Sequence, residues 1–193
     1  AATAALAAEP LRVGLMEDVS GDLAVLGKPK LNGSQLAVEE INKAGGILGR
    51  QIELIHLDPQ GDNARYQEFT RRLLSKDKVD VLIGGITSAS REVIRPVLTR
   101  NKTLYFYNTQ YEGGVCDRNT FCTGVTPGQT VAKLIPYAMK KWGKKVYVVA
   151  ADYNYGQITS QWVKKFVQEN GGSVASIDFF PLDVTNFGPT ISK

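Results

Sequence analysis

The chain has 193 residues, of which 43% are hydrophobic and 22% are charged, with a formal net charge of +4. This ordinary globular composition suffices for one large domain or two small ones. The basic residues are scattered apart from the group at 139–145, which lies beside an expected helix end. No RNP, zinc-finger or helix-turn-helix pattern accompanies them, so a nucleic-acid partner is not expected.

The first residues, AATAALAAEP, have the small-residue, Ala-x-Ala texture found where a signal peptidase cuts. We therefore expect residues 1–9 to be a signal-peptide remnant or a disordered tail on an exported protein, with an engineered leftover as the alternative. No segment of the sequence has the roughly 20 apolar residues that a transmembrane helix needs.

Predicted strands and helices alternate along the rest of the chain. In order, they are a strand at 11–17, a helix at 32–46, a strand at 51–58, a helix at 64–78, a strand at 79–85, a helix at 90–101, a strand at 103–108, a helix at 128–143, a strand at 145–152, a helix at 156–172 and a strand at 173–180. Pro96 is expected to kink or interrupt its helix. This alternation predicts an α/β fold of parallel sheets with helices on both faces.

Helical periodicity predicts which side chains face the core. They are Leu36, Ala37, Ile41 and Ala44 in the first helix, Tyr66, Phe69, Leu73 and Leu74 in the second, and Val131, Leu134, Ile135, Ala138 and Trp142 in the helix at 128–143. A last helix is expected to begin near Pro189, with Thr185 or Asn186 as its N-cap.

Enzyme motifs are broken or missing. The segment GDLAVLGKP at 21–29 has one residue too many for a P-loop, and Pro29 stands where the magnesium-binding hydroxyl belongs. No G-x-G-x-x-G follows the first strand, and no G-x-S-x-G occurs, although Ser88 lies in a nucleophile-like turn. His56, the only histidine, lies within a predicted strand, which favours a structural imidazole over a general base. We expect no catalytic residue, no cofactor and no metal.

Hydroxyl groups follow three of the predicted strands. They belong to Ser88 after the strand at 79–85, Tyr107 and Thr109 at the end of the strand at 103–108, and Tyr153 after the strand at 145–152. Ligands bind beyond the carboxyl ends of parallel strands, so these residues predict a small-ligand site. Taken singly, Ser88 fits an N-cap equally well, Thr109 a turn, and the tyrosines ordinary packing.

Cys116 and Cys122 flank five residues in the loop that follows this site. In an exported chain an even cysteine count predicts a disulfide. A zinc site is not expected, because zinc takes four ligands and the chain has a single histidine.

Several segments resemble the type I periplasmic solute-binding proteins of ABC importers. LAVEEINKAGGILGRQIELIHLDPQGD is similar to the opening of that family, in which an Asn-x-x-Gly-Gly stop and a Gly-Arg turn lead to the second strand. IGGITSASREVIRPVL and YNTQYEGG resemble its two ligand-binding turns, and YEGG with DYNYG looks more like the amide- and urea-binding branch than the branched-chain amino-acid branch. The resemblance implies ligand contacts at Ser88, Tyr107, Thr109 and Tyr153. We also expect Gln110 to contact the ligand, and Asp152 is the one nearby carboxylate that could pair with an ammonium group.

The resemblance also implies a two-lobe fold, with lobe I at 10–124 and an incomplete lobe II at 125–193, so we expect the chain to be the N-terminal half. An unfinished lobe would expose apolar surface, so we expect it to self-associate. The implied function is a periplasmic component of an ABC importer that captures a small polar solute by lobe closure and delivers it to a membrane permease. A short-chain amide or urea is the preferred solute and a branched-chain amino acid the next. The alternatives are the ligand-binding ectodomain of a receptor or sensor, and a hydrolase of small amides.

Overall fold

The computed structural model describes residues 9–191, so the predicted N-terminal tail lies outside the described residues except for Glu9. Within this range the chain divides into two compact units. Unit 1 comprises residues 9–86, 90–108 and 116–122, and unit 2 comprises 87–89, 109–115 and 123–191. The predicted lobe limits, 10–124 and 125–193, stay a prediction. No helix in the described range is both long and apolar enough to cross a membrane.

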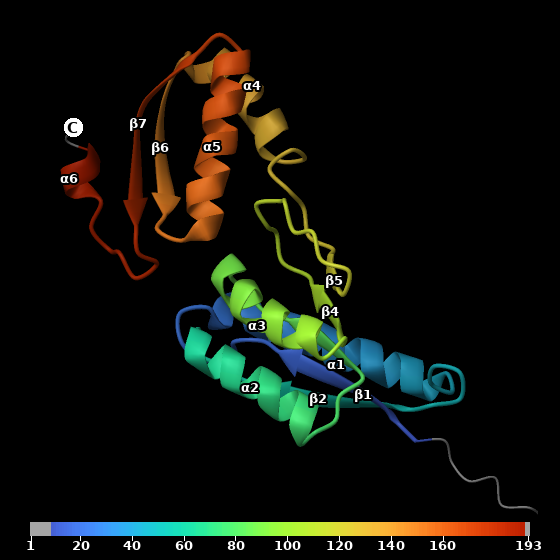
Figure 1. The fold of residues 1–193 in the computed structure, drawn as a ribbon. Coiled ribbons are helices and arrows are strands. Elements are labelled where there is room, and N and C mark those ends of the chain that lie inside the picture. Colours follow the sequence, from blue (N-terminus) through green and yellow to red (C-terminus); the bar gives the residue numbers. More distant parts are fainter. Residues whose placement is uncertain (1–8, 192–193) are drawn as a thin grey trace, which may run out of the picture. The chain divides into compact units, whose positions relative to one another are not determined.

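Unit 1 is built on a five-stranded parallel sheet (Figure 1). Its strands are β1 (Leu11–Met16), β2 (Ile52–Leu57), β3 (Val81–Gly84), β4 (Leu104–Tyr107) and β5 (Thr120–Cys122). Their spatial order is β2-β1-β3-β4-β5, so the direction of strand progression reverses between β1 and β3. The α/β class and the parallel sheet predicted from the alternating pattern are thus confirmed, and β5 is a strand that the sequence pattern missed.

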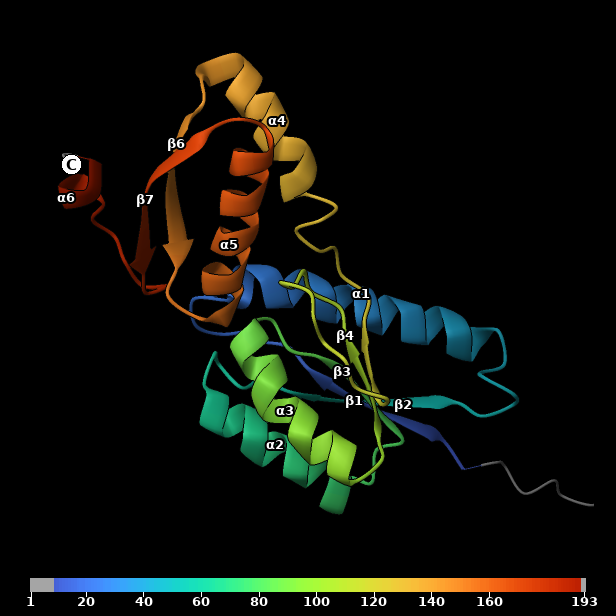
Figure 2. The same cartoon turned by 45° about the horizontal axis from the view of Figure 1, so that its top comes forward.

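Three helices cover this sheet: α1 (Ala24–Lys43), α2 (Asn63–Ser75) and α3 (Ser88–Arg100). Figure 2 shows α1 on one face and α2 with α3 on the other. The core between them contains apolar side chains with no exposed surface: Leu15, Met16, Leu73, Leu82, Ile94 and Leu98. Tyr66 and Leu73 are buried on α2 as predicted, and Asp62 caps that helix by accepting backbone N–H bonds from its first turn.

The orientation predicted for the first helix is wrong. Leu36, Ala37, Ile41 and Ala44 are all exposed, Leu36 by 56%. The side chain of Asn42 directs its own face of the helix toward β2. Its Nδ2 donates to Ile52 O at 2.9 Å, and its Oδ1 accepts from Ile52 N at 2.7 Å. These two bonds hold α1 against β2 by a face at helical spacing, which consists of Leu31, Ser34, Val38 and Asn42.

Two further corrections concern α3 and the cysteine loop. The helix α3 runs through Pro96 without interruption. The predicted disulfide is wrong: Cys116 is exposed, Cys122 is paired in β5 beside Tyr107, and no disulfide joins the two sulfurs. Asp117 fastens this loop instead, because its carboxylate accepts bonds from the Thr99 hydroxyl at 2.7 Å and from the loop's own backbone.

Unit 2 is built on the parallel pair β6 (Lys145–Ala151) and β7 (Ser173–Phe180). Its helices are α4 (Val131–Trp142), α5 (Asn154–Glu169) and the short α6 (Gly188–Ile191). Asn186 Oδ1 accepts the Gly188 N–H at 2.9 Å, in keeping with its predicted role as a cap. In Figure 1 the helix α5 runs alongside both strands.

The core of unit 2 is a narrow stripe. Val131, Ile135 and Met139 of α4 pack against Val167 of α5. Burial of Val131 and Ile135 confirms the prediction, but Leu134 is 59% exposed and Trp142 is 71% exposed, so the inward orientation predicted for these two is wrong. On α4 the buried residues recur at every fourth position, so they form a narrow stripe along the helix. Apolar residues beside that stripe, such as Leu134 and Trp142, therefore remain exposed.

Candidate functional site

The structure places most of the predicted ligand residues in unit 2. This unit contains Ser88, Thr109, Gln110, Asp152 and Tyr153, whereas Tyr107 belongs to unit 1. Three separate segments of the chain supply the unit 2 residues, since they come from 87–89, 109–115 and the region after residue 123.

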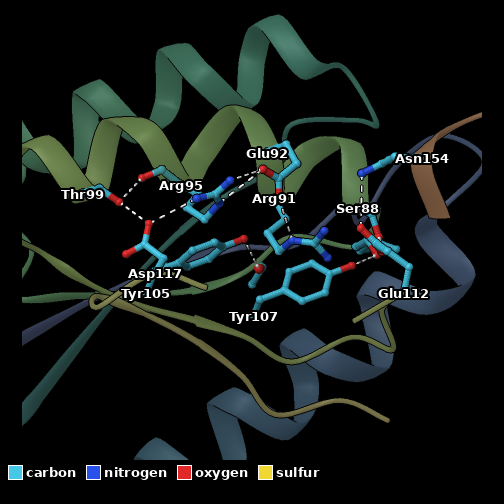
Figure 3. A network of polar contacts seen from close by, with 12 residues as sticks. Ser88, Arg91, Glu92, Arg95, Thr99, Tyr105, Tyr107, Glu112, Asp117 and Asn154 are labelled. Atoms are coloured by element: carbon cyan, nitrogen blue, oxygen red, sulfur yellow. Dashed lines mark hydrogen bonds and ion pairs between the residues drawn. The ribbon is translucent and has the colours of Figure 1, made fainter. Parts of the chain in front are cut away.

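Ser88 is bonded to a buried carboxylate. It is the first residue of α3, it is 1% exposed, and its hydroxyl donates to Glu112 Oε2 at 2.5 Å (Figure 3). Glu112 is itself only 4% exposed. A hydrogen bond to an ionised acceptor is shorter and stronger than one between neutral groups, and here water has little access to replace it. The Ser88–Glu112 pair therefore fixes the direction of the hydroxyl proton.

Glu112 is held from the side of α5 as well. Asn154 Nδ2 lies 3.4 Å from Glu112 Oε1, and Trp162 Nε1 donates to the Glu112 backbone oxygen at 3.2 Å. Figure 3 shows Ser88 and Asn154 converging on this carboxylate. The sequence analysis did not name Glu112, and Asp152 as the carboxylate for an ammonium group stays a prediction. The signal was present in the Tyr-Glu-Gly segment, where a lone acid follows a strand end.

The loop that carries Thr109 and Gln110 is anchored by its backbone. Tyr111 N donates to Val125 O at 3.1 Å. A Cβ atom at Gly124 would lie 2.1 Å from Thr109 O, so only glycine permits the two segments to approach this closely. Thr109 is half-buried and Gln110 is exposed.

Asp152 and Tyr153 lie between β6 and α5. Asp152 is exposed, and its Oδ1 accepts from Gln157 Nε2 at 3.1 Å. Tyr153 is half-buried and precedes α5 as its N-cap, without a side-chain capping bond. Its ring stacks on Tyr155, with centroids 6.1 Å apart. Tyr153 thus presents an aromatic side chain at the carboxyl end of a strand, where the sequence pattern predicts it.

Tyr107 has a different environment in unit 1. Its side chain has no exposed surface, its hydroxyl donates to Ile86 O at 2.9 Å, and the Arg91 guanidinium lies 4.9 Å from the ring centroid. Arg91 is 1% exposed and pairs with Glu92 at 3.0 Å. These contacts tie β4 to α3, so they support the fold of unit 1.

The same helix is linked to the cysteine loop through Asp117. The Thr99 hydroxyl, which donates to this carboxylate, lowers the pKa of Asp117, and Arg95 at 3.3 Å adds to the effect. In the described part of the chain, no group of three or more His, Cys, Asp or Glu side chains is arranged to hold a metal ion.

A model of the periplasmic binding protein family matches residues 10–193. The chain belongs to this family. Among curated relatives, it is 26% identical to "Leu/Ile/Val-binding protein homolog 7" of Brucella abortus, over 93% of this chain and 48% of that protein. It is 25% identical to "Leu/Ile/Val-binding protein homolog 3" of Brucella melitensis, over 95% of this chain and 50% of that protein. The chain therefore spans about half the length of the curated relatives it matches.

Solved structures show the same fold. A solute-binding protein of an ABC transporter from Rhodopseudomonas palustris, in complex with 3,4-dihydroxybenzoic acid, has a TM-score of 0.86 at 22% identity over 95% of this chain and 50% of its own. The branched-chain amino-acid transporter substrate-binding protein LivJ of Streptococcus pneumoniae, in complex with isoleucine, has a TM-score of 0.84 at 24% identity over 95% and 53%. The resemblance to type I periplasmic binding proteins is confirmed. These relatives are binding components rather than enzymes, and the family indicates an extracytoplasmic protein.

Proposed function

We propose that the chain is part of the solute-binding component of an ABC importer, and that it captures a small polar solute through Ser88 and Thr109. The observation that carries this proposal is the buried Ser88–Glu112 pair. We place the protein in the periplasm after removal of a signal peptide, with a membrane permease as its partner. Solute capture by closure of two lobes, as in the family it belongs to, is part of the same proposal.

The Ser88–Glu112 pair favours a solute that carries N–H groups. The Ser88 proton is directed at Glu112 Oε2, so the lone pairs of Ser88 Oγ are what the hydroxyl can offer a solute. An amide or urea N–H matches such an acceptor, and so does the ammonium group of an amino acid. Among these, we propose a short-chain amide or urea first and a branched-chain amino acid second. An aromatic carboxylate has no N–H to donate.

A binding role is also favoured over catalysis. Nucleophilic serine catalysis needs a hydroxyl that donates to a general base, most often an imidazole. The Ser88 hydroxyl donates to a carboxylate, and the one imidazole, His56, lies 3.0 Å from the Glu17 backbone oxygen through Nε2. We therefore propose that the protein is not an enzyme.

Removal of single hydroxyls tests this function. In the full-length protein, Ser88→Ala and Thr109→Val should each raise the Kd of the solute roughly tenfold to a hundredfold, because a solute group left without its partner costs about 1–3 kcal/mol. Isothermal titration calorimetry measures the effect, and Ser75→Ala, which removes an exposed hydroxyl from α2, is the matched control. Unchanged affinity in both site variants would contradict the proposal.

A further inference from the structure

Large apolar side chains lie exposed on α4, outside the core of unit 2. Leu134, Tyr137 and Trp142 are 59%, 57% and 71% exposed. Leu134 and Tyr137 are three residues apart, so they are neighbours on the helix surface, and the rings of Tyr137 and Trp142 lie edge to face with centroids 6.1 Å apart. A single exposed apolar residue is ordinary, but a contiguous group of them indicates a surface that contacts a partner.

The same helix and the turn that follows it carry a concentration of positive charge. Five lysines lie in this segment: Lys133, Lys140, Lys141, Lys144 and Lys145. All five are exposed, and within residues 9–191 none of them forms an ion pair. The sequence contains no Asp or Glu from residue 118 to residue 151, and Glu169 of the neighbouring helix α5 pairs with Lys165 at 3.9 Å. The positive charge of this segment is therefore available to an anionic partner.

The cationic and aromatic side chains are close to one another. Lys141 Nζ lies 5.1 Å from the centroid of the Trp142 ring and 5.9 Å from that of the Tyr137 ring. An aromatic face attracts a cation, so these contacts keep the ammonium group beside the apolar groups. Gly143 ends α4 with a φ of 108°, which favours glycine, and the chain passes through Lys144 directly into β6. The turn thus keeps the aromatic rings and the lysines at one end of unit 2, where Figure 1 shows the end of α4 beside the start of β6.

This combination of residues matches the boundary between water and a lipid bilayer. Trp and Tyr concentrate at that boundary because each has an apolar ring and a polar N–H or O–H group, and lysines extend their ammonium groups to the head groups. Anionic head groups also attract such lysines electrostatically. The carboxylates of a protein partner would match only the charge, whereas a lipid surface matches both the lysines and the exposed apolar side chains.

We propose that Leu134, Tyr137, Trp142 and the five lysines form a docking surface, the α4 surface, for an anionic lipid membrane. The lysines contact the phosphate groups of the lipids, and the two aromatic rings enter the head-group region. Each lysine near an anionic surface changes the binding constant about fivefold. None of these residues belongs to the candidate solute site, so the docking is a second binding activity beyond the proposed capture of a solute.

Co-sedimentation of the full-length protein with lipid vesicles tests this docking. One set of vesicles contains equal parts of phosphatidylglycerol and phosphatidylcholine, and vesicles of phosphatidylcholine alone are the neutral comparison. We expect binding to the anionic vesicles only, and weaker binding as the NaCl concentration rises from about 50 mM to about 500 mM. Equal binding to both sets would overturn the proposal. So would a lack of binding to the anionic vesicles, which is the result if another part of the full-length protein covers the α4 surface.

A pair of double variants separates the α4 surface from the net charge of the protein. Lys140→Gln with Lys141→Gln should weaken binding to the anionic vesicles about 25-fold, because two lysines are lost. The matched control is Lys28→Gln with Lys43→Gln, which removes the same charge from exposed positions of α1 in unit 1. This control should change the binding constant by less than about twofold. An equal loss in the two double variants would overturn the proposal, because net charge alone would then account for the binding.

The aromatic contribution is tested at Trp142. Trp142→Ala should weaken vesicle binding about tenfold, whereas Leu48→Ala, which shortens a side chain that is 98% exposed in unit 1, should not. The tryptophan fluorescence of the parent should shift to shorter wavelength on the anionic vesicles, and Trp142→Phe should lose that shift while it keeps most of the binding. Binding without this shift would overturn the proposal. Retention on immobilised hexaglutamate without binding to vesicles would also overturn it, and would assign the α4 surface to an acidic protein partner.

Discussion

The bond between Ser88 and Glu112 makes a quantitative prediction for the stability of unit 2. We expect Ser88→Ala, Glu112→Ala and the double variant to give a coupling energy of about 1.5–3 kcal/mol, the range for hydrogen bonds to charged groups. The 2.5 Å distance and the burial of both residues, 1% and 4% exposed, argue for this full range rather than the smaller value of a solvated pair.

Urea denaturation followed by tryptophan fluorescence measures this coupling. Both tryptophans of the chain, Trp142 and Trp162, lie in unit 2, so the signal reports on that unit. A control cycle on the exposed pair Asp152 and Gln157, joined at 3.1 Å in the same unit, should give less than about 0.5 kcal/mol. A Ser88–Glu112 coupling as small as the control would refute the inference that this pair fixes the hydroxyl proton.

Three further predictions concern local structure. Asp62→Ala should cost about 1 kcal/mol in urea denaturation, because it leaves two backbone N–H groups of α2 without their cap, and an unchanged midpoint would count against this. Gly124→Ala should lower the thermal midpoint, because its Cβ would meet Thr109 O. Gly128→Ala should not, because its Cβ would have only an ordinary contact, with Thr126 Oγ1 at 3.8 Å; equal effects would disprove the close approach at Gly124. In the folded protein burial raises the pKa of Glu17 to about 7, above its ordinary value of 4.5, so the stability that the protonated side chain contributes is lost as the pH rises from 4.5 to 7. Over this range the free energy of unfolding of the parent, followed by circular dichroism, should fall by up to about 3 kcal/mol relative to that of Glu17→Gln. A difference between the two proteins that does not change with pH would contradict the shift.

Sequence periodicity predicted the sheet well because buried parallel strands are continuous apolar runs. The strand predicted at 173–180 matches β7, and β3 and β4 lie inside their predicted ranges. It failed for the orientation of α1, which depends on the two bonds that Asn42 makes with a strand ten residues further along the chain. A helical pattern of apolar residues does not contain that information.

The candidate site was predicted in part for a related reason. Hydroxyls at strand ends are a local signal, so Ser88, Thr109 and Tyr153 could be named from the sequence. Glu112 meets Ser88 across 24 residues, and its burial depends on how the loop folds back. A contact between residues so far apart in the sequence depends on the tertiary structure, which a local pattern does not reveal.

Native mass spectrometry of the full-length protein, after incubation with acetamide, urea, L-leucine and benzoate together, tests solute binding most directly. We predict that one N–H-bearing solute is retained at one molecule per protein and that Ser88→Ala loses it, while Ser75→Ala keeps it. Retention of benzoate alone, retention of none of the four, or retention that Ser88→Ala does not change would contradict the proposed function.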